Sequence, residues 1–116
     1  MNNLLFTFEM LQAIAIANPG GFTVNKDTLQ PINHGFTVAV KETQNSFGNY
    51  GAAKVIKYAK DHKEVQALGG WKNSENGKFY FDAVIICDSL NEAIKLGREN
   101  KQLAIFNLDT LEEIKL

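Results

Sequence analysis

One stretch of apolar alternation, residues 78–87, constrains the fold of this chain more than any other. Side chains alternate between the two faces of a strand, so Phe79 and Phe81 lie on one face and Tyr80 and Asp82 on the other. Apolar residues dominate both faces, which is typical of a strand in the middle of a sheet. We therefore expect residues 78–87 to form the central strand on which the rest of the chain packs.

The residues on either side of this strand predict a β-β-α-β module over residues 69–108. A strand at 65–71 and a polar turn at 73–77 lead into the central strand. After it, Ser89 and Glu92 have the spacing of a capping box, in which each side chain satisfies an unpaired N–H at the start of a helix. This is the firmest local signal in the chain.

The N-terminal residues 4–17 predict a helix, capped by Asn2 or Asn3 and ended by the Asn-Pro-Gly-Gly sequence at 18–21. A strand over residues 5–10 is the weaker alternative. The few polar side chains of the helix form no wide polar face. We therefore expect it to be either deeply buried or partly covered by a second copy of the chain.

Two short β-rich runs, residues 21–25 and 35–41, are joined by a turn-rich connection and are expected to pair as an antiparallel hairpin. A polar loop at 42–51 then leads into a helix at 50–62, whose apolar residues share one face. Its outer face carries four lysines: Lys54, Lys57, Lys60 and Lys63.

The last two β-rich runs, 103–107 and 112–116, predict a final hairpin, which gives the order α-ββ-α-ββ-α-ββ. Antiparallel hairpins with helices packed on the sheet define an α+β fold. The length indicates one domain over residues 1–116. Within it we distinguish the helix at 1–19, a first ββα half at 21–62 and a second at 65–116 that includes the C-terminal hairpin.

Charge and cysteine content narrow the functional classes. The formal net charge of −1 argues against a general affinity for nucleic acid or anionic membranes. The single cysteine, Cys87, lies in an apolar run and is expected to be a buried, inert thiol, which favours an intracellular, cytoplasmic protein. The N-terminal apolar stretch lacks a basic start and is too short and interrupted to span a bilayer.

Several short motifs make the chain resemble a family of uncharacterised small domains encoded by phages and conjugative elements. These motifs span most of the chain from Gly20 onward, at residues 21–24, 31, 35–40, 41–48, 69–71, 80–82, 92–93 and 102–106. The resemblance implies a mobile-element setting, with an accessory or host-defence-countering role. It implies no established activity and no catalytic residues.

We find no pattern that predicts a metal, a cofactor or a catalytic residue. His34 and His62 lie in separate segments without ligands at metal-site spacing, and no phosphate-binding glycine motif is present. Asp82 is expected to accept hydrogen bonds from a neighbouring strand, because an unpaired carboxylate in an apolar strand is costly. Trp71 is expected to anchor the core rather than to stack on a ligand.

The sequence favours a non-enzymatic protein-interaction module, which binds a protein partner or forms a homodimer through the N-terminal helix. We place the contact surface on the polar loop at 41–50 and the start of the following helix, where hydrogen-bonding groups, aromatics and positive charges gather. The predicted contact residues are Lys41, Gln44, Asn45, Ser46, Tyr50, Lys54 and Lys57.

Two alternatives remain open. In the first, the helix face with Lys54, Lys57 and Lys60 makes the protein a weak nucleic-acid-binding accessory. In the second, Asp82 and Tyr80 lie in the cleft of an enzyme of unrecognised type, which a deep pocket around Asp82 and a strongly shifted pKa of its carboxyl would favour.

Overall fold

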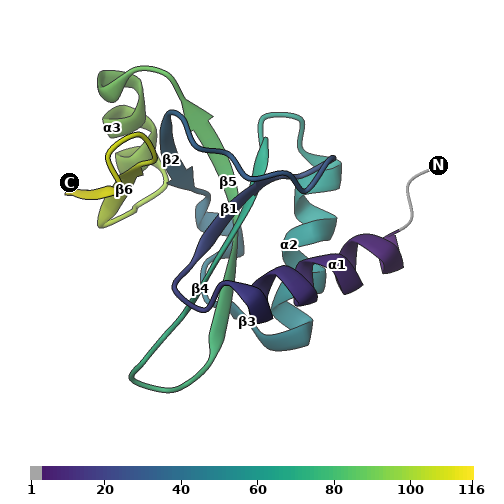
Figure 1. The fold of residues 1–116 in the computed structure, drawn as a ribbon. Helices are drawn as coiled ribbons and strands as arrows, with labels where there is room; N and C mark the ends of the chain where they lie inside the picture. The colour runs from purple at the N-terminus through teal and green to yellow at the C-terminus, as the bar shows by residue number, and fades with distance from the viewer. Residues whose placement is uncertain (1–3) are drawn as a thin grey trace.

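The structure, a computed structural model, describes residues 4–116 and confirms the predicted α+β class (Figure 1). Within these residues, three α-helices pack on one antiparallel sheet of seven strands. In chain order the elements are α1 (Leu4–Ala17), β1 (Phe22–Asn25), β2 (Phe36–Ala39), the short 3-10 helix η1 (Lys41–Thr43), β3 (Ser46–Phe47), α2 (Gly48–Asp61), β4 (Ala67–Lys72), β5 (Phe79–Cys87), α3 (Leu90–Glu99), β6 (Ala104–Asn107) and β7 (Glu112–Lys115).

Strand β5 is the centre of the sheet, as predicted. The strand order is β1-β4-β5-β2-β6-β7, and β3 also pairs with β5. The β4–β5 hairpin follows the expected module and runs in register from Ala67 opposite Val84 to Lys72 opposite Phe79. The predicted C-terminal hairpin forms between β6 and β7.

The predicted hairpin between residues 21–25 and 35–41 is wrong. Strand β1 pairs with β4, and β2 pairs with β5 and β6, so the β4–β5 hairpin lies between the two strands that were expected to pair. An isolated bridge from Val24 to Pro31 and local backbone hydrogen bonds, such as that from the Asn25 N–H to the Gln30 carbonyl, close the connection on itself. A ten-residue connection does not hold two strands side by side as a two-residue turn does. The partners of β1 and β2 are therefore determined by pairing with strands that are distant in the sequence.

The helices begin and end close to the predicted positions. Helix α1 has the predicted bounds, whereas its predicted caps, Asn2 or Asn3, lie outside the described residues. At the start of α3 the Ser89 hydroxyl accepts the Glu92 N–H at 3.4 Å, which confirms this half of the capping box. At Gly97 a Cβ would lie 2.6 Å from Leu116, so glycine allows α3 to approach the C-terminal hairpin.

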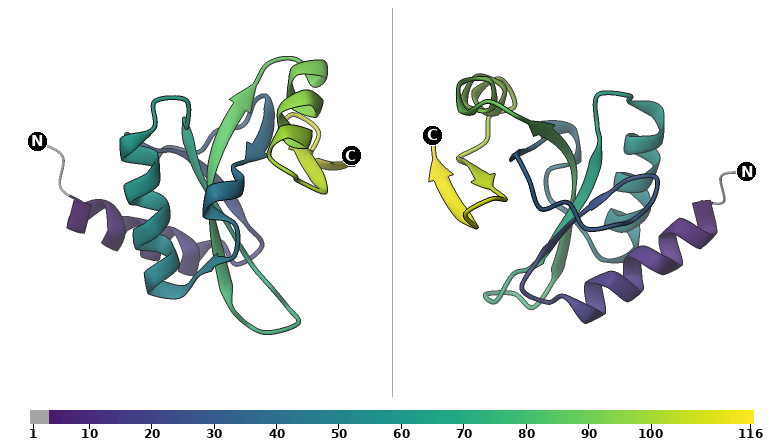
Figure 2. Two further views of the ribbon diagram at one scale, coloured as in Figure 1. Left: turned by 180° about the vertical axis from the view of Figure 1, so that it is seen from behind. Right: turned by 45° about the horizontal axis from the view of Figure 1, so that its top comes forward.

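The buried residues of all three helices pack against the same face of the sheet, which we call the covered face. Figure 2 shows α1 and α2 at one end of the sheet and α3 with the β6–β7 hairpin at the other. Under α1 and α2 the core includes Leu11, Val55 and Phe81. Under α3 a second cluster includes Val38 and Ala93. The two clusters meet at Ile85 of β5, which packs against both.

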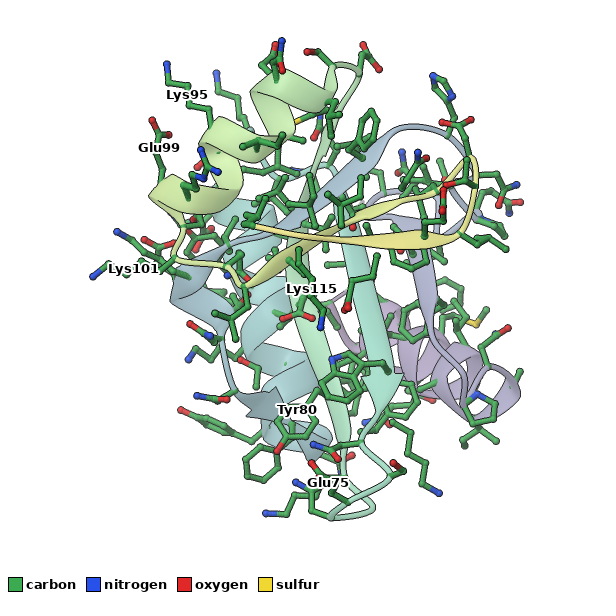
Figure 3. All side chains as sticks on the ribbon, turned by 90° about the vertical axis from the view of Figure 1, so that its left-hand side faces the viewer. Glu75, Tyr80, Lys95, Glu99, Lys101 and Lys115 are labelled. Carbon is green, nitrogen blue, oxygen red and sulfur yellow. The ribbon has the colours of Figure 1, made fainter. Side chains whose placement is uncertain are left out.

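The opposite face of the sheet, which we call the open face, carries no helix within residues 4–116. Strand alternation and register place on it Thr23, Thr37, Trp71, Tyr80, Asp82 and Phe106. Figure 3 shows Tyr80 on the sheet near the turn that bears Glu75. Loops rather than helices cover part of this face, since Ala67 and Val84 on it are buried, and the part around Trp71 is exposed and accessible to a ligand.

Helix α1 is only partly buried by its own chain. Leu11 and Ala15 are in the core, whereas Phe6 is 60% and Met10 40% exposed, and Leu5 and Ile16 are exposed as well. The helix therefore presents apolar surface to solvent. The predicted homodimer through this helix stays a prediction.

Candidate functional site

The predicted contact residues lie around β3 and the start of α2, and most of them are exposed. Lys41, Gln44 and Asn45 are exposed in the loop, as are Tyr50, Lys54 and Lys57 on the helix. Ser46 is the exception: it is 4% exposed, and its hydroxyl is buried with no hydrogen-bond partner among the described residues. Strand β3 pairs Ser46 with Phe81 and turns its side chain inward, so its predicted role in a contact surface stays a prediction that its buried hydroxyl does not favour.

The loop at 41–50 is an integral part of the fold. The buried Thr43 hydroxyl accepts the Ala83 N–H of β5 at 3.1 Å, and the Lys41 N–H donates to the Asn100 side chain at 3.1 Å. A Cβ at Gly51 would lie 2.9 Å from the Ser46 carbonyl oxygen, so α2 begins in direct contact with β3. These contacts hold the loop against the edge of the open face.

Three aromatic side chains form a row across β3, β5 and β4, which we call the aromatic strip. Phe47 and Trp71 both lie opposite Tyr80 in the register. The ring centroids are 5.4 Å apart for Phe47 and Tyr80 and 5.3 Å apart for Tyr80 and Trp71, and the second pair is stacked. The Lys78 ammonium lies 4.2 Å from the centre of the Phe47 ring.

The expectation that Trp71 anchors the core is wrong. Trp71 is 44% exposed on the open face and does not anchor the core, whereas Phe81 of β5 is 2% exposed within it. Side-chain alternation could not predict the face on which Trp71 lies, because Gly69 and Gly70 precede it and have no side chains. Phe47 belongs to the predicted loop and its ring contacts the ring of Tyr80, so the loop and the open face form one surface.

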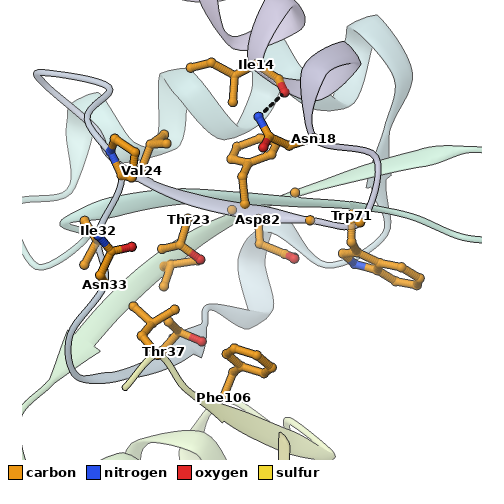
Figure 4. A pocket seen from close by; sticks show the side chains of 18 of the residues that line it. Ile14, Asn18, Thr23, Val24, Ile32, Asn33, Thr37, Trp71, Asp82 and Phe106 are labelled. Carbon is orange, nitrogen blue, oxygen red and sulfur yellow. Dashed lines mark hydrogen bonds between the residues drawn. The ribbon is translucent and has the colours of Figure 1, made fainter. Parts of the chain in front are cut away.

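Next to the strip the open face deepens into a pocket with a volume of about 980 Å³ (Figure 4). Its floor is formed by Thr23, Gly69, Asp82, Val84 and neighbouring strand residues. Its walls come from three separate segments: the end of α1 with the following glycines, the β1–β2 connection, and the β6–β7 hairpin. Trp71 belongs to both the aromatic strip and the lining of the pocket.

Two of these walls are held together by a hydrogen-bonded cluster. The Asp109 carboxylate bonds the His34 ring at 2.8 Å and accepts the Gly35 N–H at 3.1 Å. The Leu108 N–H donates to the Gly35 carbonyl at 2.8 Å. The carboxylate raises the pKa of His34, and its bond to His34 lowers the pKa of Asp109. The β1–β2 connection is therefore fixed against the C-terminal hairpin.

Asp82 lies in the middle of this pocket and lacks the partner that was expected for it. In residues 4–116 its carboxylate accepts no hydrogen bond and forms no ion pair, so the predicted pairing with a neighbouring strand is wrong. Burial alone raises the pKa of its carboxyl to about 6, because the charged form loses water without gaining a compensating contact. Such an acid is ready to receive a ligand's hydrogen-bond donor or positive charge.

Gly69 is the pocket residue that sequence reasoning missed. It lies between Thr23 and Asp82 in the register, and its missing side chain leaves the floor open beside the carboxylate. A Cβ there would point over the same floor, 3.3 Å from a Val84 methyl. The Gly-Gly sequence was visible from the start, but its meaning depends on β1 being the neighbour of β4.

The other candidate groups in residues 4–116, a thiol, possible metal ligands and the lysine face of α2, do not form a second site. Cys87 is buried, as predicted, and burial raises the pKa of its thiol. No group of three or more His, Cys, Asp or Glu side chains in the described chain is arranged to hold a metal ion. Lys57 pairs with Asp61 one turn later on α2, which lowers the pKa of that carboxyl and partly neutralises the lysine face.

Comparison with protein-family models, curated proteins and solved structures returned no match. Among residues 4–116 no helix has both the length and the apolar character needed to cross a membrane.

Proposed function

We propose that this protein is a non-enzymatic protein-interaction module that binds its partner on the open face of the sheet. Its resemblance to domains of phages and conjugative elements adds the expectation of a cytoplasmic accessory protein that acts on a host or element protein, in a role such as countering host defence. The predicted loop at 41–50 lies at the edge of this contact surface, because Phe47 belongs to both.

The aromatic strip is the observation that carries this proposal. Tyr and Trp are enriched among the residues that dominate binding energy at protein interfaces, because they bury a large area and lose little side-chain entropy. Here they are already stacked on one another, on a sheet face without a helix. A pre-ordered aromatic surface reduces the entropic cost of binding.

An enzyme is the second candidate, favoured by the pocket around Asp82 and by a carboxyl pKa of about 6. An acid of this pKa suits proton transfer near neutral pH. The residues that line the pocket, however, include no His, Cys or Lys to act as a second catalytic group. Glu113 also lines the pocket, but burial is the sole cause of the Asp82 shift, so the two carboxyls do not act as a coupled pair.

Nucleic acid is a weaker ligand for the same face. Exposed aromatic rings stack on bases, but the grooves that bind single strands are positively charged to follow the phosphates. The charged residues that line this pocket are both acids, Asp82 and Glu113. A salt-sensitive shift of the protein with single-stranded DNA or RNA would favour this reading over protein binding.

Variants on two surfaces test the proposal. Wild type, Phe47→Ala/Tyr80→Ala and Lys54→Glu/Lys57→Glu are used as baits in lysate of the cells from which the chain comes. A protein retained by wild type is identified by mass spectrometry, purified and titrated calorimetrically. We expect the aromatic double variant to bind it at least tenfold more weakly, since interface aromatics are frequent hot spots.

The lysine double variant decides between the two surfaces. Lys54 and Lys57 are exposed on α2, so the variant keeps the fold and serves as a matched control for changes on the open face. Full binding by the aromatic variant together with loss of binding by the lysine variant would move the contact surface to α2 and contradict the proposal. Circular dichroism melting of each bait verifies that it is folded.

A further inference from the structure

We propose that the pocket on the open face binds a cation carried on an apolar stem, the side chain of an arginine or lysine of the partner protein, with the Asp82 carboxylate as its counter-ion. This inference rests on the proposed protein-interaction function and names the chemistry that the partner must present. Nothing in the resemblance or in the comparisons assigns a ligand to this pocket.

The charge of the pocket favours a cation. Two of the residues that line it are acids, Asp82 on the floor and Glu113 on the C-terminal hairpin, and none is Lys, Arg or His. Lys115 is on the same strand as Glu113 but does not line the pocket. The only formal charges that a ligand meets inside are therefore negative, and a positive group gains from both.

The Asp82 carboxylate also needs a partner. Asp82 is largely but not fully buried, and a carboxylate that loses much of its water without gaining a hydrogen bond is destabilising. An ammonium or guanidinium that bonds Asp82 would satisfy this acid and favour its ionised form, which burial alone disfavours.

The shape of the pocket suits a long side chain that enters with its charged end first. The space over Gly69 leads down to Asp82, and Val84, Ile32 and Leu111 offer apolar contacts for a methylene stem. Trp71 lines the same pocket and presents an aromatic ring to which cations are attracted (Figure 4). A volume of about 980 Å³ also accommodates residues next to the cation, as in a peptide segment.

A metal ion fits this pocket less well. Calcium takes six to eight oxygen ligands and magnesium demands octahedral geometry, whereas the floor supplies one carboxylate. No cluster of three acidic or metal-binding side chains is found in the described part of the chain. An organic cation with several N–H donors and an apolar stem matches the mixture of one acid and many apolar groups.

The test is a ¹H–¹⁵N NMR titration at pH 7.5 with N-acetyl-arginine methylamide, its lysine analogue and its citrulline analogue. Citrulline has nearly the shape of arginine without the charge. We expect arginine or lysine to shift the signals of Gly69, Asp82 and the Trp71 indole, with affinity at least tenfold above that of citrulline. Binding of either cation supports the proposal, and the tighter one identifies the preferred head group.

Two variants locate the effect. Asp82→Asn keeps the size of the side chain and removes its charge, and it should weaken cation binding at least tenfold. Gly69→Ala, which narrows the floor next to a flexible Val84 methyl, should weaken it as well while the fold is kept. Lys95→Glu, at an exposed position on α3, is the control that should leave the titration unchanged.

Binding of the citrulline analogue as tight as that of arginine, cation binding that survives in Asp82→Asn, or no shift on the open face would each overturn the proposal. Failure here is distinct from failure of the proposed function, because Phe47 and Tyr80 do not line the pocket. If partner binding needs those two rings but arginine does not bind at Asp82, the interaction function stands and the cation site falls.

Discussion

The two faces of the sheet are formed by alternate residues of the same strands, yet they differ in what covers them. Gly70 and Gly69 are neighbours on β4. A side chain at Gly70 would meet the Phe22 and Phe79 rings at 2.5–2.7 Å, whereas one at Gly69 would lie 3.3 Å from a Val84 methyl and 3.6 Å from the Phe22 carbonyl oxygen. On β5, Phe81 is buried while the next residue, Asp82, lies unpaired in a pocket. Most of the apolar core thus lies on the covered face, and the exposed part of the open face is available for binding.

The largest expected difference is in the loss of stability when an aromatic residue is truncated on the covered face or on the open face. Phe81→Ala should destabilise the protein by about 3–5 kcal/mol, because it leaves a cavity in the core. Trp71→Ala should cost about 1 kcal/mol, since Trp71 is largely a surface residue stacked on Tyr80. Urea unfolding of both variants measures the difference, and equal losses would contradict the assignment of the two faces.

The sequence predicts those differences between the two faces that depend on patterns within one helix or strand. Alternation within β5 correctly assigned Phe81 and Asp82 to opposite faces, and the Ser89 capping box located α3, because both patterns lie within one element. The partners of β1 and β2 are set by contacts between distant segments, which no local pattern encodes. The pocket was therefore not predictable, since its walls depend on that pairing.

The second effect is a stabilising substitution on the open face. Folded protein retains the Asp82 proton up to about pH 6, whereas the unfolded chain releases it near pH 3.8. Between these values the native state binds more protons, so stability falls as the pH rises and stays lower above the window. Asp82→Asn should therefore be more stable than wild type by about 3 kcal/mol at pH 7.5 and nearly equal to it at pH 3.5.

Thermal or urea unfolding at the two pH values checks this difference. A covered-face substitution such as Val55→Ala serves as the matched control, because it should destabilise by a similar amount at both pH values. An Asp82→Asn variant less stable than wild type at pH 7.5 would show that the carboxylate makes a favourable contact in the folded protein.

The smallest effect compares the two neighbouring glycines. Gly70→Ala should destabilise by about 1–3 kcal/mol, because the new methyl group forces the Phe22 and Phe79 rings apart. Gly69→Ala should change stability by less than about 1 kcal/mol, since Val84 needs to move only slightly. Chemical unfolding of the pair gives the result, and a reversed order would mean that the open face is the more tightly packed.

The most direct test of the central claim is the pKa of Asp82, measured by ¹³C NMR of its carboxyl carbon from pH 3 to 9. If the open face holds a buried acid without a partner, the free protein should titrate with a pKa of about 6 at this residue. Saturating N-acetyl-arginine methylamide should lower that pKa, because a bound cation favours the ionised carboxylate. A pKa near 3.8 in the free protein, unchanged by the arginine derivative, would contradict the account.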